Sequence, residues 1–199
     1  MSKAAVKFLR ERDATMASLI DYFGVLKIEK RSADFGALVK IIISQQLSTK
    51  AASSIFRRLQ EIDGNSTLKP AAIALIPDEK FKSAGVSHAK TQYIKSIASL
   101  VLAEPRFFTS LSRMNNERVL SRLTDLKGVG AWSASIFLMF YLGREDIFPS
   151  GDVSLNKAIT SIYGEIDSTP EVFSRRWSPY RTLACQYLWK SVDQPVVLS

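Results

Sequence analysis

The chain has 199 residues, 46% of them hydrophobic and 23% charged, which is typical of a globular protein with one domain or two closely packed lobes. No apolar run reaches the roughly 20 residues needed to cross a bilayer, so we expect no membrane partner. A single cysteine, Cys185, excludes an intrachain disulfide and a four-cysteine iron–sulfur cluster. The net charge of +8 indicates a polyanionic partner, although many basic soluble proteins bind no nucleic acid.

Helical periodicity is the one regular pattern evident in the sequence and alternating strand patterns are absent, so the predicted fold is all-α. Apolar residues at helical spacing over residues 35–43 predict a buried helix face, and Ser48 is placed to cap the helix that follows. Pro70 and Pro77 bracket a short helix. Ser87 is placed to cap a further helix.

A glycine turn separates two helical patterns in the second half of the chain. Residues 119–126 carry apolar side chains at helical spacing, and residues 131–142 are apolar or small almost throughout. Gly128 and Gly130, between them, permit positive φ and leave space for a close ligand. The first amides of the second helix are unpaired and favour an anion. This turn is a candidate phosphate-binding hairpin; a tight helical hairpin in the core is an equal alternative from these residues alone.

Asp152 follows residues 149–151 (Pro-Ser-Gly) and begins another helical pattern. An aspartate at a helix start is an ordinary N-cap, and the residues taken alone favour that interpretation. Further along, Ser178 before Pro179 is typical of a helix start, and that helix is expected to reach Trp189.

Four stretches together resemble the helix-hairpin-helix plus Gly-Pro-Asp signature of the DNA glycosylase superfamily, and within it the short yeast-type alkylpurine (3-methyladenine) branch. They are residues 41–48 (IIISQQLS), residues 84–94 (AGVSHAKTQYI), the hairpin with residues 148–152 (FPSGD), and residues 177–189. The resemblance implies one glycosylase unit over residues 1–199. Its two helical lobes, about residues 33–110 and about residues 1–32 plus 111–199, would face each other across a DNA-binding cleft that receives a flipped nucleotide.

The resemblance also implies the chemistry. Asp152 occupies the position of the catalytic aspartate, whose carboxylate stabilises an oxocarbenium ion and activates water. Trp132 stands where bifunctional relatives carry a Schiff-base lysine, so we expect base removal without strand cleavage. Trp132, Ile136 and Trp189 would line the base pocket, where an indole face attracts a positively charged alkylated base. Core packing is the alternative role for both tryptophans.

Two segments are expected to contact DNA. One is the hairpin Lys127, Gly128, Val129 and Gly130, which would bind a phosphate. The family often binds a monovalent cation on hairpin carbonyls, which correspond to those of Thr124, Leu126 and Val129. The other is the loop Gln45, Gln46, Leu47 and Ser48, which would enter the minor groove. Solvated amides at a helix end are the alternative for this loop, and an inward orientation is also considered for Leu47.

The predicted function is removal of alkylated purines from duplex DNA by monofunctional N-glycosidic hydrolysis, by a monomer that needs no cofactor. Three departures from the family pattern, at Ile136, Ser48 and Ser154, keep a second hypothesis open. In that hypothesis the protein binds abasic or distorted DNA with weak or no base excision. A purely structural module is the third and least favoured reading. The predicted location is the nucleus in a eukaryote, and the cytoplasm or nucleoid otherwise.

Overall fold

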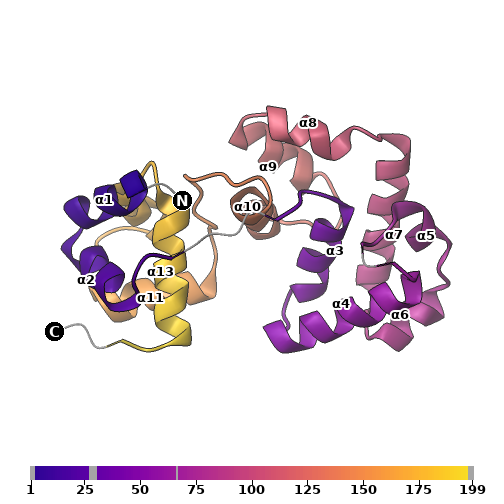
Figure 1. Cartoon of the computed structure of the whole chain (residues 1–199), viewed down its shortest axis with the longest axis horizontal. Helices are drawn as coiled ribbons and strands as arrows, with labels where there is room; N and C mark the ends of the chain where they lie inside the picture. Colours follow the sequence, from indigo (N-terminus) through magenta and orange to yellow (C-terminus); the bar gives the residue numbers. More distant parts are fainter. Residues whose placement is uncertain (1–2, 27–30, 66, 197–199) are drawn as a thin grey trace. The chain divides into compact units, whose positions relative to one another are not determined.

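The computed structural model describes residues 3–26, 31–65 and 67–196, and within them the chain is all-α, as predicted (Figure 1). These residues form thirteen α-helices and one short 3-10 helix, and no strand. None of the described helices is long and apolar enough to cross a membrane. Residue contacts divide the chain into two compact units: unit 1 is Met1–Lys30 with Leu138–Ser199, and unit 2 is Arg31–Phe137.

Unit 2 is built around the apolar helix α3. Its helices are α3 (Phe35–Ser44), α4 (Thr49–Asp63), α5 (Pro70–Leu75), α6 (Asp78–Ala84), α7 (His88–Ala103), α8 (Phe107–Arg113), α9 (Asn116–Thr124) and the first part of α10 (Ala131–Phe140). Leu38, Val39 and Ile42 are fully buried, which confirms the predicted core face of α3. This helix packs against both α4 and α7.

Helix starts in unit 2 follow the predicted caps. The Ser48 hydroxyl accepts a hydrogen bond from the Ala51 amide and caps α4. Ser87 likewise caps α7 through the Lys90 amide. Pro70 is the first residue of α5. Each of these side chains stabilises the first turn of its helix, where the amides have no intrahelical partner.

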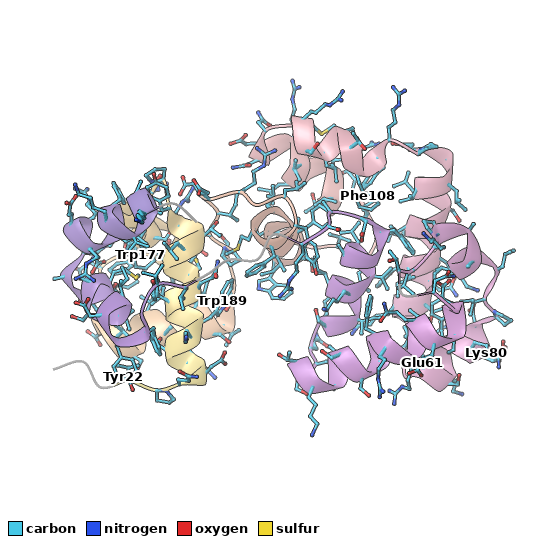
Figure 2. All side chains as sticks on the ribbon, viewed as in Figure 1. Tyr22, Glu61, Lys80, Phe108, Trp177 and Trp189 are labelled. Carbon is cyan, nitrogen blue, oxygen red and sulfur yellow. The ribbon has the colours of Figure 1, made fainter. Side chains whose placement is uncertain are left out.

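Unit 2 extends further along the chain than the predicted lobe of about residues 33–110. The hairpin segment belongs to it because its side chains pack there: Arg122 forms an ion pair with Glu104, and the Phe137 ring lies 6.1 Å from that of Phe108 (labelled in Figure 2). Residues 111–137 therefore group with residues 31–110, whereas the prediction grouped them with the N-terminal segment.

Unit 1 contains both end segments of the chain. Its helices are α1 (Lys3–Arg12), α2 (Ala14–Phe23), the end of α10, α11 (Val153–Tyr163), α12 (Pro170–Phe173), the 3-10 helix η1 (Ser174–Trp177) and α13 (Arg181–Asp193). The C-terminal helix α13, yellow in Figure 1, packs against α2 and α11. Leu183, Cys185 and Leu188 of α13 are buried and form the centre of this unit.

Inside unit 1, the buried carboxylate of Asp13 in the N-terminal segment binds side chains from the C-terminal part of the chain. Asp13, which is 8% exposed, caps α2 by accepting the Met16 amide at 3.0 Å. Its other oxygen accepts hydrogen bonds from the Trp177 indole at 2.9 Å and from the Tyr163 hydroxyl at 3.1 Å. Burial, followed by the charge of Asp13, raises the pKa of Tyr163, so the phenol remains a donor. Three donors thus satisfy this buried anion.

The predicted helix start at Ser178–Pro179 is wrong. Helix α13 begins at Arg181, and a cis peptide bond joins Ser178 to Pro179. The N-cap residue is Tyr180, which makes no side-chain cap hydrogen bond, and the Ser178 hydroxyl two positions earlier donates to Asp146 Oδ2 at 2.8 Å. The helix does continue through Trp189, as predicted.

Candidate functional site

Asp152 is both a helix cap and the centre of a polar contact with α13. Its Oδ1 accepts the Leu155 amide at 2.8 Å, so the predicted N-cap role is present. The same oxygen accepts the indole Nε1 of Trp189 at 3.2 Å. The carboxylate is only 8% exposed. Two N–H donors on one oxygen fix the orientation of this buried anion.

Trp189 has an aromatic neighbour as well as the carboxylate. Trp189, labelled in Figure 2, is half-buried on α13. Its ring lies 6.0 Å from that of Phe140, with 32° between the ring planes. One edge of the indole therefore faces Asp152 while the ring packs on Phe140. The structure thus brings together two of the residues predicted for one site, Asp152 and Trp189.

The loop before Asp152 is held by the first turn of α13. Arg181 binds Asp146 through Nε at 2.6 Å and Nη2 at 3.0 Å. Burial alone would raise the pKa of Asp146, but hydrogen bonds from Arg181 and Ser178 outweigh burial and lower it. The Thr182 hydroxyl donates to the Arg144 carbonyl at 2.7 Å. These contacts fix the backbone that leads into Asp152.

The hairpin between α9 and α10 is tightly packed at one glycine and open at the other. Gly128 has φ +85°, and a Cβ there would lie 2.2 Å from a ring carbon of Tyr93. Gly130 is exposed, and no heavy atom of the described residues would lie within 4 Å of a Cβ at that position. Lys127 is exposed and Val129 is buried. The open side of the hairpin therefore carries Lys127 and Gly130.

Hairpin carbonyls were also predicted to hold a monovalent cation. The Leu126 carbonyl accepts the Val129 amide at 3.0 Å, which leaves one oxygen lone pair for another contact. This bonding pattern is compatible with a cation on the carbonyls of Thr124, Leu126 and Val129, which stays a prediction.

The loop of residues 45–48 divides into one anchored residue and three exposed ones. Gln45 Nε2 donates to the Gly128 carbonyl at 2.8 Å and to the Ser133 hydroxyl at 3.0 Å. Gln46 has φ +57°, and it, Leu47 and Ser48 are exposed. An inward orientation of Leu47 is wrong, because its side chain is 41% exposed. The left-handed turn at Gln46 redirects the chain and places Leu47 at the surface.

The remaining predicted site residues lie on α10. Trp132 and Ile136 are half-buried and stand four positions apart on α10, so they share one face of that helix. On α7, His88 is an exposed residue at the start of the helix, and its Nδ1 lies 3.9 Å from Asp78 Oδ2. Lys90 has no predicted role, although a lysine in the first turn of a helix opposes the helix dipole and so indicates a stabilising partner elsewhere in the fold.

Residues 39–181 match the family described as "HhH-GPD superfamily base excision DNA repair protein". This match covers more than half of the chain and includes the hairpin, Asp152 and the start of α13. The chain belongs to the HhH-GPD superfamily, which confirms the predicted family and its all-α fold.

Similar proteins lie in the 3-methyladenine branch, as the motifs predicted. DNA-3-methyladenine glycosylase 1 of Schizosaccharomyces pombe is 28% identical, over 92% of this chain and 83% of that protein. The alkylbase DNA glycosidase-like protein mag2 of the same organism is 30% identical, over 94% of this chain and 92% of that protein.

Two solved structures share the fold along almost their whole length. DNA-3-methyladenine glycosidase from Bacillus halodurans is 35% identical with a TM-score of 0.83, and the alignment covers 96% of this chain and 89% of that one. The Schizosaccharomyces pombe 3-methyladenine DNA glycosylase, solved in complex with abasic DNA, is 27% identical with a TM-score of 0.87, covering 99% and 100%.

Proposed function

We propose that this protein removes alkylated purines from duplex DNA by hydrolysing their N-glycosidic bonds, and that it leaves the DNA strand intact. The observation that carries the proposal is the buried carboxylate of Asp152, oriented by Leu155 and Trp189 at the start of α11. Relatives named as 3-methyladenine glycosylases supply the substrate class.

In the proposed reaction Asp152 acts by its charge. As the bond to the base breaks, positive charge develops at C1′ of the sugar, and a nearby carboxylate stabilises it. The same group can orient the attacking water or accept its proton. Since two N–H groups already fix the carboxylate, little reorganisation is needed during the reaction.

Strand cleavage is not part of the proposed reaction. Bifunctional members of the superfamily use a lysine at the position occupied here by Trp132, and an indole cannot form the Schiff base that strand cleavage requires. We assign Trp132, Ile136 and Trp189 to the base pocket. A cationic alkylated base is attracted to an indole face, which discriminates it from the neutral normal base.

The DNA contacts are assigned to the hairpin and the loop of unit 2. The open side of the hairpin, with Gly130 at the start of α10, presents amides to a phosphate. In the loop, Gln46 and Leu47 are exposed whereas Gln45 is tied to the hairpin. We therefore assign Gln46 and Leu47 to the space left by the flipped nucleotide.

Binding of damaged DNA without excision is the second candidate function. One observation favours it. Ser48 is a small side chain already used as the cap of α4, so it offers no bulk to a vacated base stack.

We further propose that the protein acts as a monomer, in the nucleus if the cell is eukaryotic.

One assay separates the two functions. The protein is incubated with duplex containing 3-methyladenine or 7-methylguanine, and free base is measured together with abasic sites that break in alkali. Release of free base without nicking supports the glycosylase. Nicking without alkali, or covalent trapping by borohydride, contradicts the monofunctional mechanism. Tight binding to an abasic duplex with no base release supports the second function instead.

A further inference from the structure

Lys90, in the first turn of α7, reaches the end of a different helix. Its Nζ donates to the Ile43 carbonyl at 2.9 Å and to the Gln45 carbonyl at 2.8 Å. The last carbonyls of α3 have no intrahelical partner, and α3 has no basic residue in its own last turn. The Lys90 ammonium thus supplies hydrogen-bond donors and a positive charge at the negative end of the α3 dipole.

This placement of Lys90 is unfavourable for its own helix. A positive charge in the first turn of α7 opposes that helix's dipole, which favours anions there. Lys90 is also half-buried, and burial lowers its pKa. The contacts with α3 offset both effects, so they are the reason why a charged side chain lies at this position.

The contacts of Lys90 continue toward the hairpin. Gln45, whose carbonyl binds Lys90, donates its side-chain amide to the Gly128 carbonyl at 2.8 Å. Tyr93 stands three positions after Lys90 on the same face of α7, and its ring occupies the space beside Gly128. One face of α7 therefore supports both the loop of residues 45–48 and the hairpin.

The backbone conformation of Gln46, the residue that follows Gln45, requires stabilising contacts from the surrounding structure. Gln46 adopts a left-handed backbone, which costs a non-glycine residue about 1 kcal/mol and persists only where the surrounding structure holds it. Lys90 holds the carbonyl immediately before this residue, and the Gln45 side chain holds it from the hairpin side. Two independent attachments thus fix the start of the exposed loop.

We propose that Lys90 is a positioning residue for damage recognition: it holds the exposed loop, Gln46 to Ser48, in register with the hairpin. The inference rests on the proposed function, because it takes the loop to enter DNA where a nucleotide has left the stack. Binding of intact duplex, which uses phosphate contacts, depends little on the loop. Loss of Lys90 should therefore reduce the preference for damaged DNA more than the affinity for DNA in general.

A matched pair of variants tests this proposal. Lys90→Met keeps the apolar stem and removes the ammonium. Lys95→Met removes the same charge from the same helix, but Lys95 binds Asp78 instead of the loop. Dissociation constants are measured for a duplex with a tetrahydrofuran abasic-site analogue and for the same duplex without it. We expect the preference for the abasic duplex to fall about tenfold in Lys90→Met and to stay unchanged in Lys95→Met. Lys90→Arg, which keeps charged donors, should retain most of the preference for the abasic duplex.

Hydrogen exchange of the DNA-free protein supplies an independent readout. Amides of residues 46–49 should exchange faster in Lys90→Met than in the wild type or Lys95→Met. An unchanged preference with unchanged exchange overturns the proposal, as does an equal loss of binding to both duplexes in both variants. If Lys90→Met does not fold, Lys90→Gln decides by the same two measurements. A wild type without any preference for abasic DNA contradicts the assumed entry of the loop into the opened stack, and the exchange experiment still tests the Lys90 contact. Failure of the proposed function is read separately, from the absence of base release by the wild type.

Discussion

The indole Nε1 of Trp189 donates a hydrogen bond to Oδ1 of Asp152 at 3.2 Å, across 37 positions of sequence. The Leu155 amide binds the same oxygen at 2.8 Å. The carboxylate is therefore oriented from two helices, α11 and α13. Trp189 combines two roles that are usually assigned to different residues, because its ring offers a stacking face while its N–H orients the proposed catalytic anion.

Trp189→Phe separates these two roles. Phenylalanine keeps an aromatic ring beside Phe140 but removes the donor to Asp152. Loss of one hydrogen bond to a charged group should lower the single-turnover excision rate by roughly 10- to 100-fold. Trp189→Leu should lower it further, because stacking is lost as well. Equal rates for Trp189→Phe and the wild type would show that the hydrogen bond does not contribute to catalysis.

Asp152→Asn tests the charge of the carboxylate. The asparagine oxygen can still accept the hydrogen bonds from Leu155 and Trp189, so the melting temperature should stay close to that of the wild type. Excision should fall by about 100-fold or more, since a neutral amide stabilises an oxocarbenium ion poorly. Binding should tighten slightly, because a negative charge near the DNA backbone is removed. Retained excision would contradict the catalytic assignment.

The two hairpin glycines predict different outcomes on replacement by alanine. Gly130→Ala meets no neighbouring atom in the described structure, so the protein should fold normally and bind damaged and intact duplex more weakly. Gly128→Ala places a Cβ 2.2 Å from the Tyr93 ring at φ +85°, so it should lower the melting temperature. Fluorescence anisotropy with each duplex, beside thermal melting, checks both. Unchanged binding by a folded Gly130→Ala protein would make the hairpin purely structural.

Leu47→Ala tests the exposed loop. Leu47 is 41% exposed, so its truncation should change stability little. If it fills the vacated stack, binding to the abasic duplex should weaken about tenfold relative to intact duplex, since a buried leucine side chain contributes roughly 1.5–3 kcal/mol. Leu75→Ala is the matched control, because Leu75 is an 84% exposed leucine at the end of α5. Identical binding by the two variants would remove Leu47 from the interface.

Much of this fold could be predicted from local signals. Ser48, Ser87 and Asp152 cap the helices that the sequence indicated, since capping depends on a side chain and an amide only two or three positions away. The helix start predicted at Ser178 is displaced to Arg181, and the Ser178 hydroxyl instead binds Asp146, which lies 32 positions earlier. A long-range partner of this kind leaves no periodic pattern in the sequence.

In the candidate site, too, local features could be predicted from the sequence and long-range contacts could not. The sequence predicts the same role, entry into the minor groove, for the adjacent residues Gln45 and Gln46. In the structure the Gln45 side chain is hydrogen-bonded to the hairpin, whereas Gln46 is exposed. That difference depends on the position of Gly128 in space, which no spacing along the chain reveals. Lys90 was missed for the same reason, because both of its acceptors are backbone carbonyls.

Cys185 predicts a chemical probe of unit 1. It is fully buried, and burial, followed by the nearby charge of Asp152, raises the pKa of its thiol. The thiol should resist alkylation in the folded protein and react only on unfolding.

The raised thiol pKa also makes the stability of the folded protein depend on pH. Its contribution to the free energy of unfolding is present below the usual thiol pKa of about 9 and is lost at higher pH, where the Cys185 thiol of the unfolded chain releases its proton. Asp13→Ala, which removes a buried acceptor from the same unit, should accelerate labelling by a maleimide.

The left-handed backbone at Gln46 sets stability against recognition at a single position. Glycine would adopt this conformation without a side-chain clash, so Gln46→Gly would favour the folded state by relieving strain. It would also delete one of the two side chains assigned to the opened DNA stack. A selection for thermostability that ranks substitutions by backbone compatibility alone would choose glycine here. The resulting variants would be more stable but would recognise damaged DNA poorly.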